Sequence, residues 1–252
     1  GKTEKVKITG STSVAPLMKV LAAAYEKENK NVRIEVGEGG SSQGIKDTQD
    51  GKNDIGMASR DLKKDSVTGE YTETGLDKIQ IAYDGVAVIN KEASIEGNNV
   101  TNEQLYALYA YGTPIGGISL PVSREDGSGT REAFDEKITD AEGNKLIDLT
   151  KFTSGIQIAN GTNIVMTDVA GNVAKLGYIS MGSLNDTVKA VKYNGVEPTV
   201  ENVKNGTYKL ARPFLIVTKS GAELSQAAKD FIDFILSEAG QKIVAEEGYV
   251  AM

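Results

Sequence analysis

Short stretches of alternating apolar and polar residues are followed along this chain by stretches in which apolar residues recur every three or four positions. Near the start, Val6–Thr9 alternates as a half-buried strand does. A turn of glycine, serine and threonine follows at 10–13, and Val14, Leu17 and Leu21 then recur at helical spacing. The pattern predicts a strand, a Gly-Ser turn and a helix in succession.

The same succession recurs directly afterwards. Val32–Val36 has the composition of a strand, 37–42 is rich in glycine and serine, and Gln43–Asp50 is predicted to be a short helix. A further short strand, 54–60, is apolar at its centre and polar at its end. Strands that alternate with helices predict a mainly parallel α/β sheet, and ligands of such sheets bind at the carboxyl ends of the strands.

A third strand-turn-helix unit lies at the middle of the chain. The strand Ser119–Ser123 leads into Arg-Glu-Asp-Gly-Ser-Gly-Thr at 124–130, and a helix is predicted over Thr130–Lys137. The two glycines let successive N–H groups face one point, and a helix N-terminus attracts negative charge, so the stretch predicts an anion cradle with Arg124 as its fixed charge. The same residues are also typical of a turn followed by a capped helix.

Two apolar stretches are suited to carry the chain from one lobe to another and back. The first is Lys78–Ile89, and the second is Arg212–Thr218. Asp84 lies inside the first, where a carboxylate must be paired or hydrogen-bonded; alternatively, it marks the turn of a hairpin. We expect a first lobe of 1–85 with 213–252 and a second lobe of 86–212, with a cleft between them.

Composition excludes several kinds of chemistry. The 252 residues include no cysteine and no histidine, which rules out disulfides, thiolate or imidazole metal sites and Ser-His-Asp triads. A net charge of -7 without a basic run argues against nucleic-acid binding. No apolar run is long enough to span a bilayer, and the chain opens with polar residues, so we expect any leader with a lipid-bearing cysteine to lie outside this sequence. No cofactor is predicted.

Several motifs resemble, in order, those of the phosphate-binding proteins of bacterial ABC transporters. They are Gly10–Leu17, Gly39–Gly44, Ile55–Arg60, Ser123–Arg131 and, in the later part of the chain, Gly177–Ser180 and Ser237–Val250. The match spans nearly the whole chain. The resemblance implies a two-lobed type II periplasmic binding protein, or Venus flytrap, in which each lobe is a mainly parallel α/β sheet flanked by helices and two hinge crossings join the lobes.

The same resemblance implies a function without catalysis. The protein is expected to bind inorganic phosphate in the cleft outside the cytoplasmic membrane, as a lipid-anchored monomer, and to deliver it to the permease subunits of an ABC transporter. The implied phosphate ligands are Thr12, Ser13, Ser41, Ser59, Arg124, Ser128, Gly129 and Thr130.

Selectivity for phosphate over sulfate needs a hydrogen-bond acceptor besides these donors. Phosphate near neutral pH carries at least one proton and sulfate carries none, so a buried carboxylate accepts from phosphate and repels sulfate. Some family members have a carboxylate after the segment that ends at Ser59, where this chain has Arg60. We therefore expect Asp84 to be the acceptor, with Asp61 and Asp126 as alternatives.

Two other functions stay open on the sequence alone. A phosphoryl-transfer enzyme would need a nucleophile with a base, or a metal, but the chain has no P-loop motif, and Asp54, Asp61 and Asp84 show no metal-ligand spacing. A binding protein or sensor for phosphate or another tetrahedral oxyanion would use the same donors. The residues do not separate a sensor from a protein that feeds a transporter.

Overall fold

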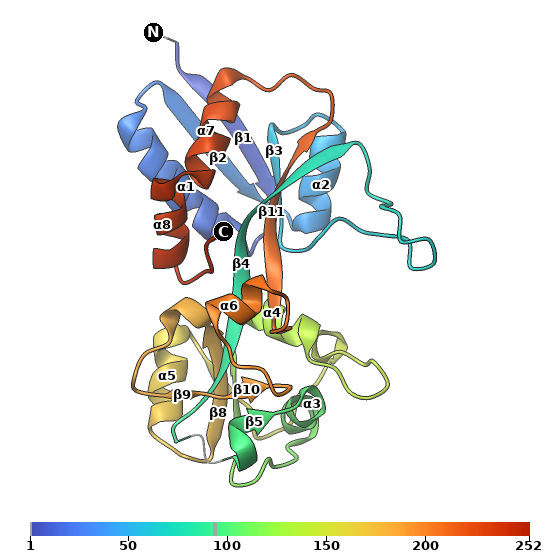
Figure 1. The fold of residues 1–252 in the computed structure, drawn as a ribbon, viewed down its shortest axis with the longest axis vertical. Helices are drawn as coiled ribbons and strands as arrows, with labels where there is room; N and C mark the ends of the chain where they lie inside the picture. Colours follow the sequence, from blue (N-terminus) through green and yellow to red (C-terminus); the bar gives the residue numbers. More distant parts are fainter. Residues whose placement is uncertain (1, 93–94) are drawn as a thin grey trace. The chain divides into compact units, whose positions relative to one another are not determined.

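The computed structural model describes residues 2–92 and 95–252 (Figure 1). Contacts divide the chain into unit 1, Gly1–Tyr83 with Pro213–Met252, and unit 2, Asp84–Arg212. Asp84 and Gly85, which we expected in the first lobe, lie in unit 2, where Asp84 is ion-paired with Arg212. In the described part of the chain, no helix combines the length and apolar composition that a membrane span requires.

The sheet of unit 1 is mainly parallel. β1 (Glu4–Gly10) pairs in parallel with β2 (Val32–Glu38) and with β3 (Ile55–Ala58), whereas β11 (Ala211–Lys219) pairs antiparallel with β3. β4 (Leu76–Asn90) begins in this unit and continues into unit 2, and β11 makes the return. Strand residues alternate between the two faces of the sheet, so that Phe214 and Ile216 pack on one face and Leu215 and Val217 on the other.

Helices cover both faces of this sheet. One face packs against α1 (Ala15–Glu28), α7 (Gln226–Leu236) and α8 (Glu238–Glu246), whose buried side chains form one cluster with the strands (Figure 1). The other face packs against α2 (Ser41–Gln49), which contributes Ile45 to a second cluster. This layering confirms the predicted α/β class for unit 1.

Unit 2 is built in the same way. Its sheet consists of the second half of β4, then β8 (Lys175–Ser180), β6 (Leu120–Arg124) and β7 (Gln157–Ala159), with β6 parallel to both β7 and β8 and β4 antiparallel to β8. β9 (Lys189–Ala190) pairs with β4, and β5 (Asn99–Val100) pairs with β10 (Lys192–Tyr193) in a separate small sheet. The helices are α3 (Asn102–Tyr111), α4 (Gly129–Lys137), α5 (Thr162–Ala170) and α6 (Val200–Lys204).

Two apolar layers position α4 and α5. On one face of the sheet, Val165 and Val169 of α5 pack on Ile179 of β8. On the other face, Phe134 of α4 stacks on Tyr178, with ring centroids 3.9 Å apart. Neighbouring residues of β8 thus hold the two helices on opposite faces, with the N-terminus of each helix after the carboxyl end of a parallel strand.

Three local predictions differ from the structure. The hairpin alternative for Asp84 is wrong, because β4 runs without a turn for 15 residues. The alternation at 190–193 predicts one strand, but the structure has two short strands there, since β9 and β10 pair with different partners. The sequence also predicts a helix over 165–174, but the helix in the structure ends at Ala170, where Gly171 begins a turn.

Candidate anion-binding site

In unit 1, the N-terminus of α2 lies very close to the end of β1. A Cβ atom on Gly44 would lie 2.5 Å from the Cα of Gly10 and 2.7 Å from the carbonyl oxygen of Thr9. The carbonyl of Gly10 also accepts from the N–H groups of Gly39 and Gly40, at 3.0 and 2.9 Å. Glycines in the first two motifs therefore allow two strand-to-helix turns to meet at one edge of the sheet.

The turn before α1 is organised by Ser11, which the sequence places in the cleft-facing segment 11–13 but not among the predicted ligands. Its buried hydroxyl accepts from the N–H groups of Ser13 and Val14, both at 3.2 Å, in the turn that precedes α1, whose N-cap residue is Val14. The predicted ligand Thr12 is exposed in this turn, and the predicted ligand Ser13 is buried.

The start of α2 brings Ser41 and Ser59 together. The Ser41 hydroxyl accepts from the N–H of Ser59 at 3.0 Å and lies 3.2 Å from the Ser59 hydroxyl. The N-cap residue is Gly40, with a φ of 90°, and no side-chain acceptor caps this helix among the residues described. The first N–H groups of α2 are thus suited to an anion.

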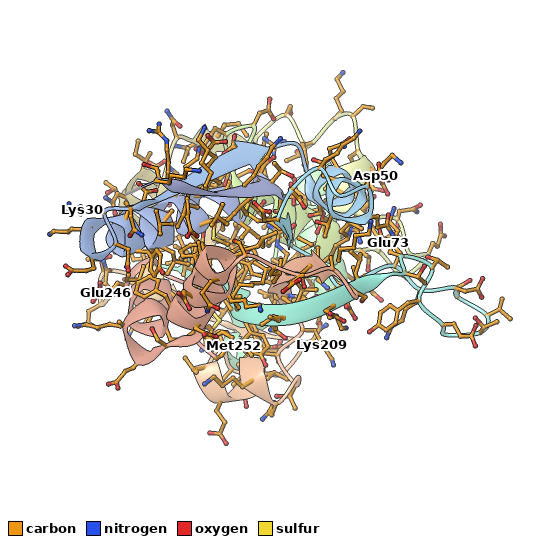
Figure 2. The ribbon with its side chains drawn as sticks, turned by 90° about the horizontal axis from the view of Figure 1, so that it is seen from above. Lys30, Asp50, Glu73, Lys209, Glu246 and Met252 are labelled. Atoms are coloured by element: carbon orange, nitrogen blue, oxygen red, sulfur yellow. The ribbon has the colours of Figure 1, made fainter. Side chains whose placement is uncertain are left out.

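Arg60, which stands where some relatives have a carboxylate, is bound within unit 1. Its guanidinium donates to both carboxylate oxygens of Glu73, at 2.7 and 3.2 Å, and to the Ser42 hydroxyl at 3.0 Å. Glu73 comes from the long connection between β3 and β4 (Figure 2). Burial raises the pKa of Glu73, but the bonds and charge of Arg60 outweigh it and lower the pKa overall. The positive charge of Arg60 is therefore largely compensated.

In unit 2, Arg124 at the end of β6 is held by a carboxylate and a hydroxyl. Its Nε and Nη2 donate to Glu125 at 2.8 and 3.3 Å, and its Nη1 donates to the Thr162 hydroxyl at 3.4 Å. The hydrogen bond from Arg124 lowers the pKa of Glu125, although burial opposes it. Arg124 is thus a partly buried, orientated cation.

The remaining predicted donors of unit 2 lie at the start of α4. Ser128 is the N-cap, and its hydroxyl accepts from the N–H of Arg131 at 3.2 Å. Gly129 is the first helical residue, and the Thr130 hydroxyl lies 3.2 Å from the Ser180 hydroxyl at the end of β8. The structure therefore gathers Arg124, Ser128, Gly129 and Thr130 in one loop and helix start.

Sequence reasoning missed Thr162 and Ser180 beside these donors. Thr162 begins α5 after Gly161, whose φ is 114°, and no side-chain acceptor caps α5 in the described part of the chain. The signal was available, because a glycine followed by a hydroxyl residue at a strand-to-helix turn is also the pattern of 10–13.

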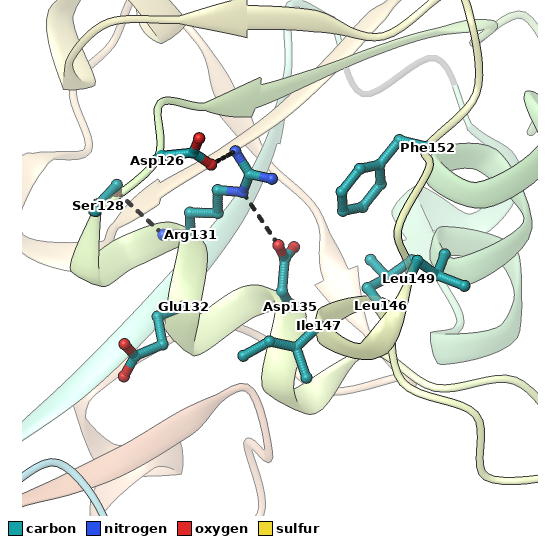
Figure 3. A pocket seen from close by; sticks show the side chains of 10 residues that line it. Asp126, Ser128, Arg131, Glu132, Asp135, Leu146, Ile147, Leu149 and Phe152 are labelled. Carbon is teal, nitrogen blue, oxygen red and sulfur yellow. Dashed lines mark hydrogen bonds and ion pairs between the residues drawn. The ribbon is translucent and has the colours of Figure 1, made fainter. Parts of the chain in front are cut away.

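Arg131 of α4 bonds to the loop at residues 124–128 and to a second residue of its own helix (Figure 3). Its Nη1 donates to the carbonyl of Arg124 at 2.9 Å and to Asp126 at 3.1 Å, and its Nε donates to Asp135 at 3.2 Å. These groups border a cavity of about 190 Å³, whose wall also includes Leu146, Ile147, Leu149 and Phe152. Burial raises the pKa of Asp135 to about 6, against the opposing charge of Arg131.

The three candidate acceptors differ in their surroundings. Asp84 is 2% exposed; its Oδ2 accepts from Arg212 at 3.1 Å, while its Oδ1 has no partner among the described residues. Asp61 accepts from Lys78 at 2.7 Å and from the N–H of Leu62 at 2.8 Å. The Asp126 side chain is fully exposed and pairs with Arg131.

The pKa values of these carboxyls separate them further. Burial raises the pKa of Asp84, although the charge of Arg212 opposes the rise. Burial also raises the pKa of Asp61, but the bonds from Lys78 and the N–H of Leu62 outweigh it and lower the pKa overall. Asp84 is therefore the one of the three that combines a buried carboxyl with an unpartnered oxygen in the described part of the chain.

Comparison with known proteins places the chain in a family. Residues 1–239 match the model of the PBP superfamily domain. A provisionally named phosphate ABC transporter substrate-binding protein from Clostridium perfringens, solved with bound phosphate, is 41% identical, with 99% of this chain and 100% of that chain covered and a TM-score of 0.65. The chain belongs to the PBP superfamily, among the PstS-like phosphate-binding proteins.

Other family members extend the comparison. The ABC-type phosphate transport receptor of Vibrio cholerae is 32% identical, with coverage of 99% of this chain and 100% of that chain and a TM-score of 0.76. Phosphate-binding protein PstS 2 of Streptococcus agalactiae is 46% identical over 132 residues, which cover 52% of this chain and 45% of that protein. The match thus spans less than half the length of this curated relative.

Proposed function

We propose that this protein binds inorganic phosphate and delivers it to the permease of an ABC transporter. The observation that carries the proposal is the arrangement at residues 124–130, where a held guanidinium, two hydroxyls and a helix N-terminus converge within unit 2. The guanidinium and the N–H groups only donate, and the hydroxyls can donate as well, which suits a tetrahedral oxyanion. Full-length similarity to a phosphate-bound relative supports phosphate as that anion.

The proposed ligands are those predicted from the sequence. In unit 1 they are Thr12, Ser13, Ser41 and Ser59, and in unit 2 they are Arg124, Ser128, Gly129 and Thr130, with Asp84 as the acceptor. We further propose that both groups bind the same phosphate and that the two units act as the lobes of a hinged binding protein.

Partners and location follow from the family. PstS-like substrate-binding proteins act outside the cytoplasmic membrane, and we propose the same location for this chain. Attachment through a lipid, a monomeric state and contact with permease subunits complete the proposal. The relatives are named as binding and transport proteins, so we propose no catalytic step. Turnover of a phosphate ester with added divalent metal would instead support an enzyme.

Calorimetry with the purified protein tests phosphate binding. Phosphate is expected to bind at micromolar or tighter levels, and sulfate is not expected to compete. Arg124→Ala should weaken binding at least about 100-fold, because it removes charge-assisted hydrogen bonds to the anion. Arg33→Ala, on the exposed side of β2, is the matched control and should leave the affinity unchanged. Equal affinities for Arg124→Ala and the parent protein would contradict the proposal.

A further inference from the structure

Arg212, in β11, bonds to two other elements, β4 and α4, through one guanidinium. It is 3% exposed, and its Nε donates to the Oδ2 of Asp84 in β4 at 3.1 Å. Its Nη2 donates to the carbonyl of Gly129 at 3.0 Å, and its Nη1 donates to Glu132 at 2.7 Å, with Glu136 at 3.4 Å. A residue of β11 therefore connects the unit boundary in β4 to the first turn of α4.

The geometry of these bonds is rigid. A guanidinium is planar and always charged, so its donors leave in fixed directions. Here one edge is directed to Asp84 and the other nitrogens to the start of α4. Because Gly129 is the first helical residue, its position determines where the N–H groups of the proposed phosphate cradle lie.

Arg212 also influences the charge of Asp84. Burial raises the pKa of the Asp84 carboxyl, and the charge and hydrogen bond of Arg212 oppose that rise, so Arg212 favours the ionised form. The facing charge of Glu132 acts in the opposite direction, toward the neutral form. Since Arg212 occupies only Oδ2, the pair leaves Oδ1 as a buried acceptor without a partner among the described residues.

We propose that Arg212 is a positioning residue for anion selectivity, which pairs with Oδ2 of Asp84, leaves Oδ1 as the acceptor and fixes it relative to the start of α4. The proposal rests on the proposed function, in which Asp84 accepts a hydrogen bond from the protonated oxygen of bound phosphate. A neutral Asp84 carboxyl would instead carry a hydrogen and could donate a hydrogen bond to sulfate. Loss of the Arg212 charge is therefore expected to admit sulfate and not merely to weaken binding.

The test compares phosphate and sulfate affinities of Asp84→Asn, Arg212→Met, the double variant and the parent protein by calorimetry at pH 7.5. Each single variant should lower the ratio of phosphate affinity to sulfate affinity at least about 100-fold, because a site that recognises a ligand proton rejects the analogue without it by orders of magnitude. The double variant should lower the ratio no further than Asp84→Asn, since both changes remove the same acceptor.

Two further variants separate positioning from a structural role. Arg212→Lys retains the charge and loses the planar fork, so it should bind phosphate more weakly but retain the ratio; it also serves if Arg212→Met does not fold. Glu136→Gln changes the most distant carboxylate partner and should leave both affinities within about twofold.

The outcomes distinguish the inference from the function on which it rests. An unchanged ratio in Asp84→Asn or in Arg212→Met would overturn the role of Arg212 while phosphate binding stands. So would a double variant whose ratio falls well below that of both single variants. Failure of the parent protein to bind phosphate would overturn the proposed function itself.

Discussion

Replacing Asp135 by asparagine tests the energetics of the buried layer behind α4. The Asp135 side chain is 6% exposed, its Oδ1 has no partner among the described residues, and burial raises its pKa from 3.8 to about 6 against the charge of Arg131. The buried hydroxyls of Tyr109 and Tyr178 lie near the same carboxyl. The folded protein therefore holds this proton to a higher pH than the unfolded chain does.

The sign and size of the effect follow from this difference. Between about pH 4 and 6 the unfolded chain has released the proton and the folded protein still binds it, so stability falls as the pH rises. Above pH 6 the cost is complete and amounts to about 3 kcal/mol, at 1.36 kcal/mol per pKa unit. Asparagine has no charge to bury, and its amide oxygen can still accept from Arg131.

We expect Asp135→Asn to raise the free energy of unfolding by about 1–3 kcal/mol at pH 7.5 and by only about 0.5 kcal/mol at pH 4. Urea denaturation of both proteins at a series of pH values measures this difference. Asp126→Asn is the matched control, because it also alters a partner of Arg131 but at an exposed position. Equal destabilisation by Asp135→Asn at both pH values would refute the reasoning and show that the ion pair stabilises the fold.

Two other predictions concern packing. Gly44→Ala would place a Cβ 2.5 Å from the backbone of Gly10, so it should destabilise the protein by about 3 kcal/mol or more in thermal unfolding. The control is Gly51→Ala, where the added Cβ meets open space and should cost about 1 kcal/mol. Similar losses would show that α2 can move away from β1. Tyr178→Phe removes a 2.8 Å hydrogen bond to Ser123 and should cost about 1 kcal/mol in urea denaturation; no loss would mean that the bond contributes nothing net.

Local patterns predicted much of the fold because the signals of a turn lie within a few residues. Glycine and hydroxyl residues after apolar strands mark the starts of α1, α2 and α4, and the structure has helices there. The sequence pattern does not separate the two short strands around Val191, because two-residue strands are defined by their pairing partners, which lie far away in the sequence.

The candidate site was harder to predict for the same reason. An apolar run around Asp84 indicates that the carboxylate must be paired, but nothing local identifies its partner as Arg212, 128 positions later. Likewise, the Ser11 hydroxyl accepts hydrogen bonds within the turn before α1, and nothing local separates this role from that of a ligand, because a hydroxyl near a helix start can serve either purpose. The donors of each unit could be named; the network that holds them required the structure.

The division of the chain has a consequence for synthesis on the ribosome. Unit 2 is one continuous segment and is complete once Arg212 has been made, whereas unit 1 still lacks Pro213–Met252. Without that segment β3 has no β11 beside it, and the apolar layer lacks Phe214 and Phe231. We therefore expect the nascent chain to fold from its middle outward, with β3 as an open sheet edge that proteases and other chains can reach until β11 arrives.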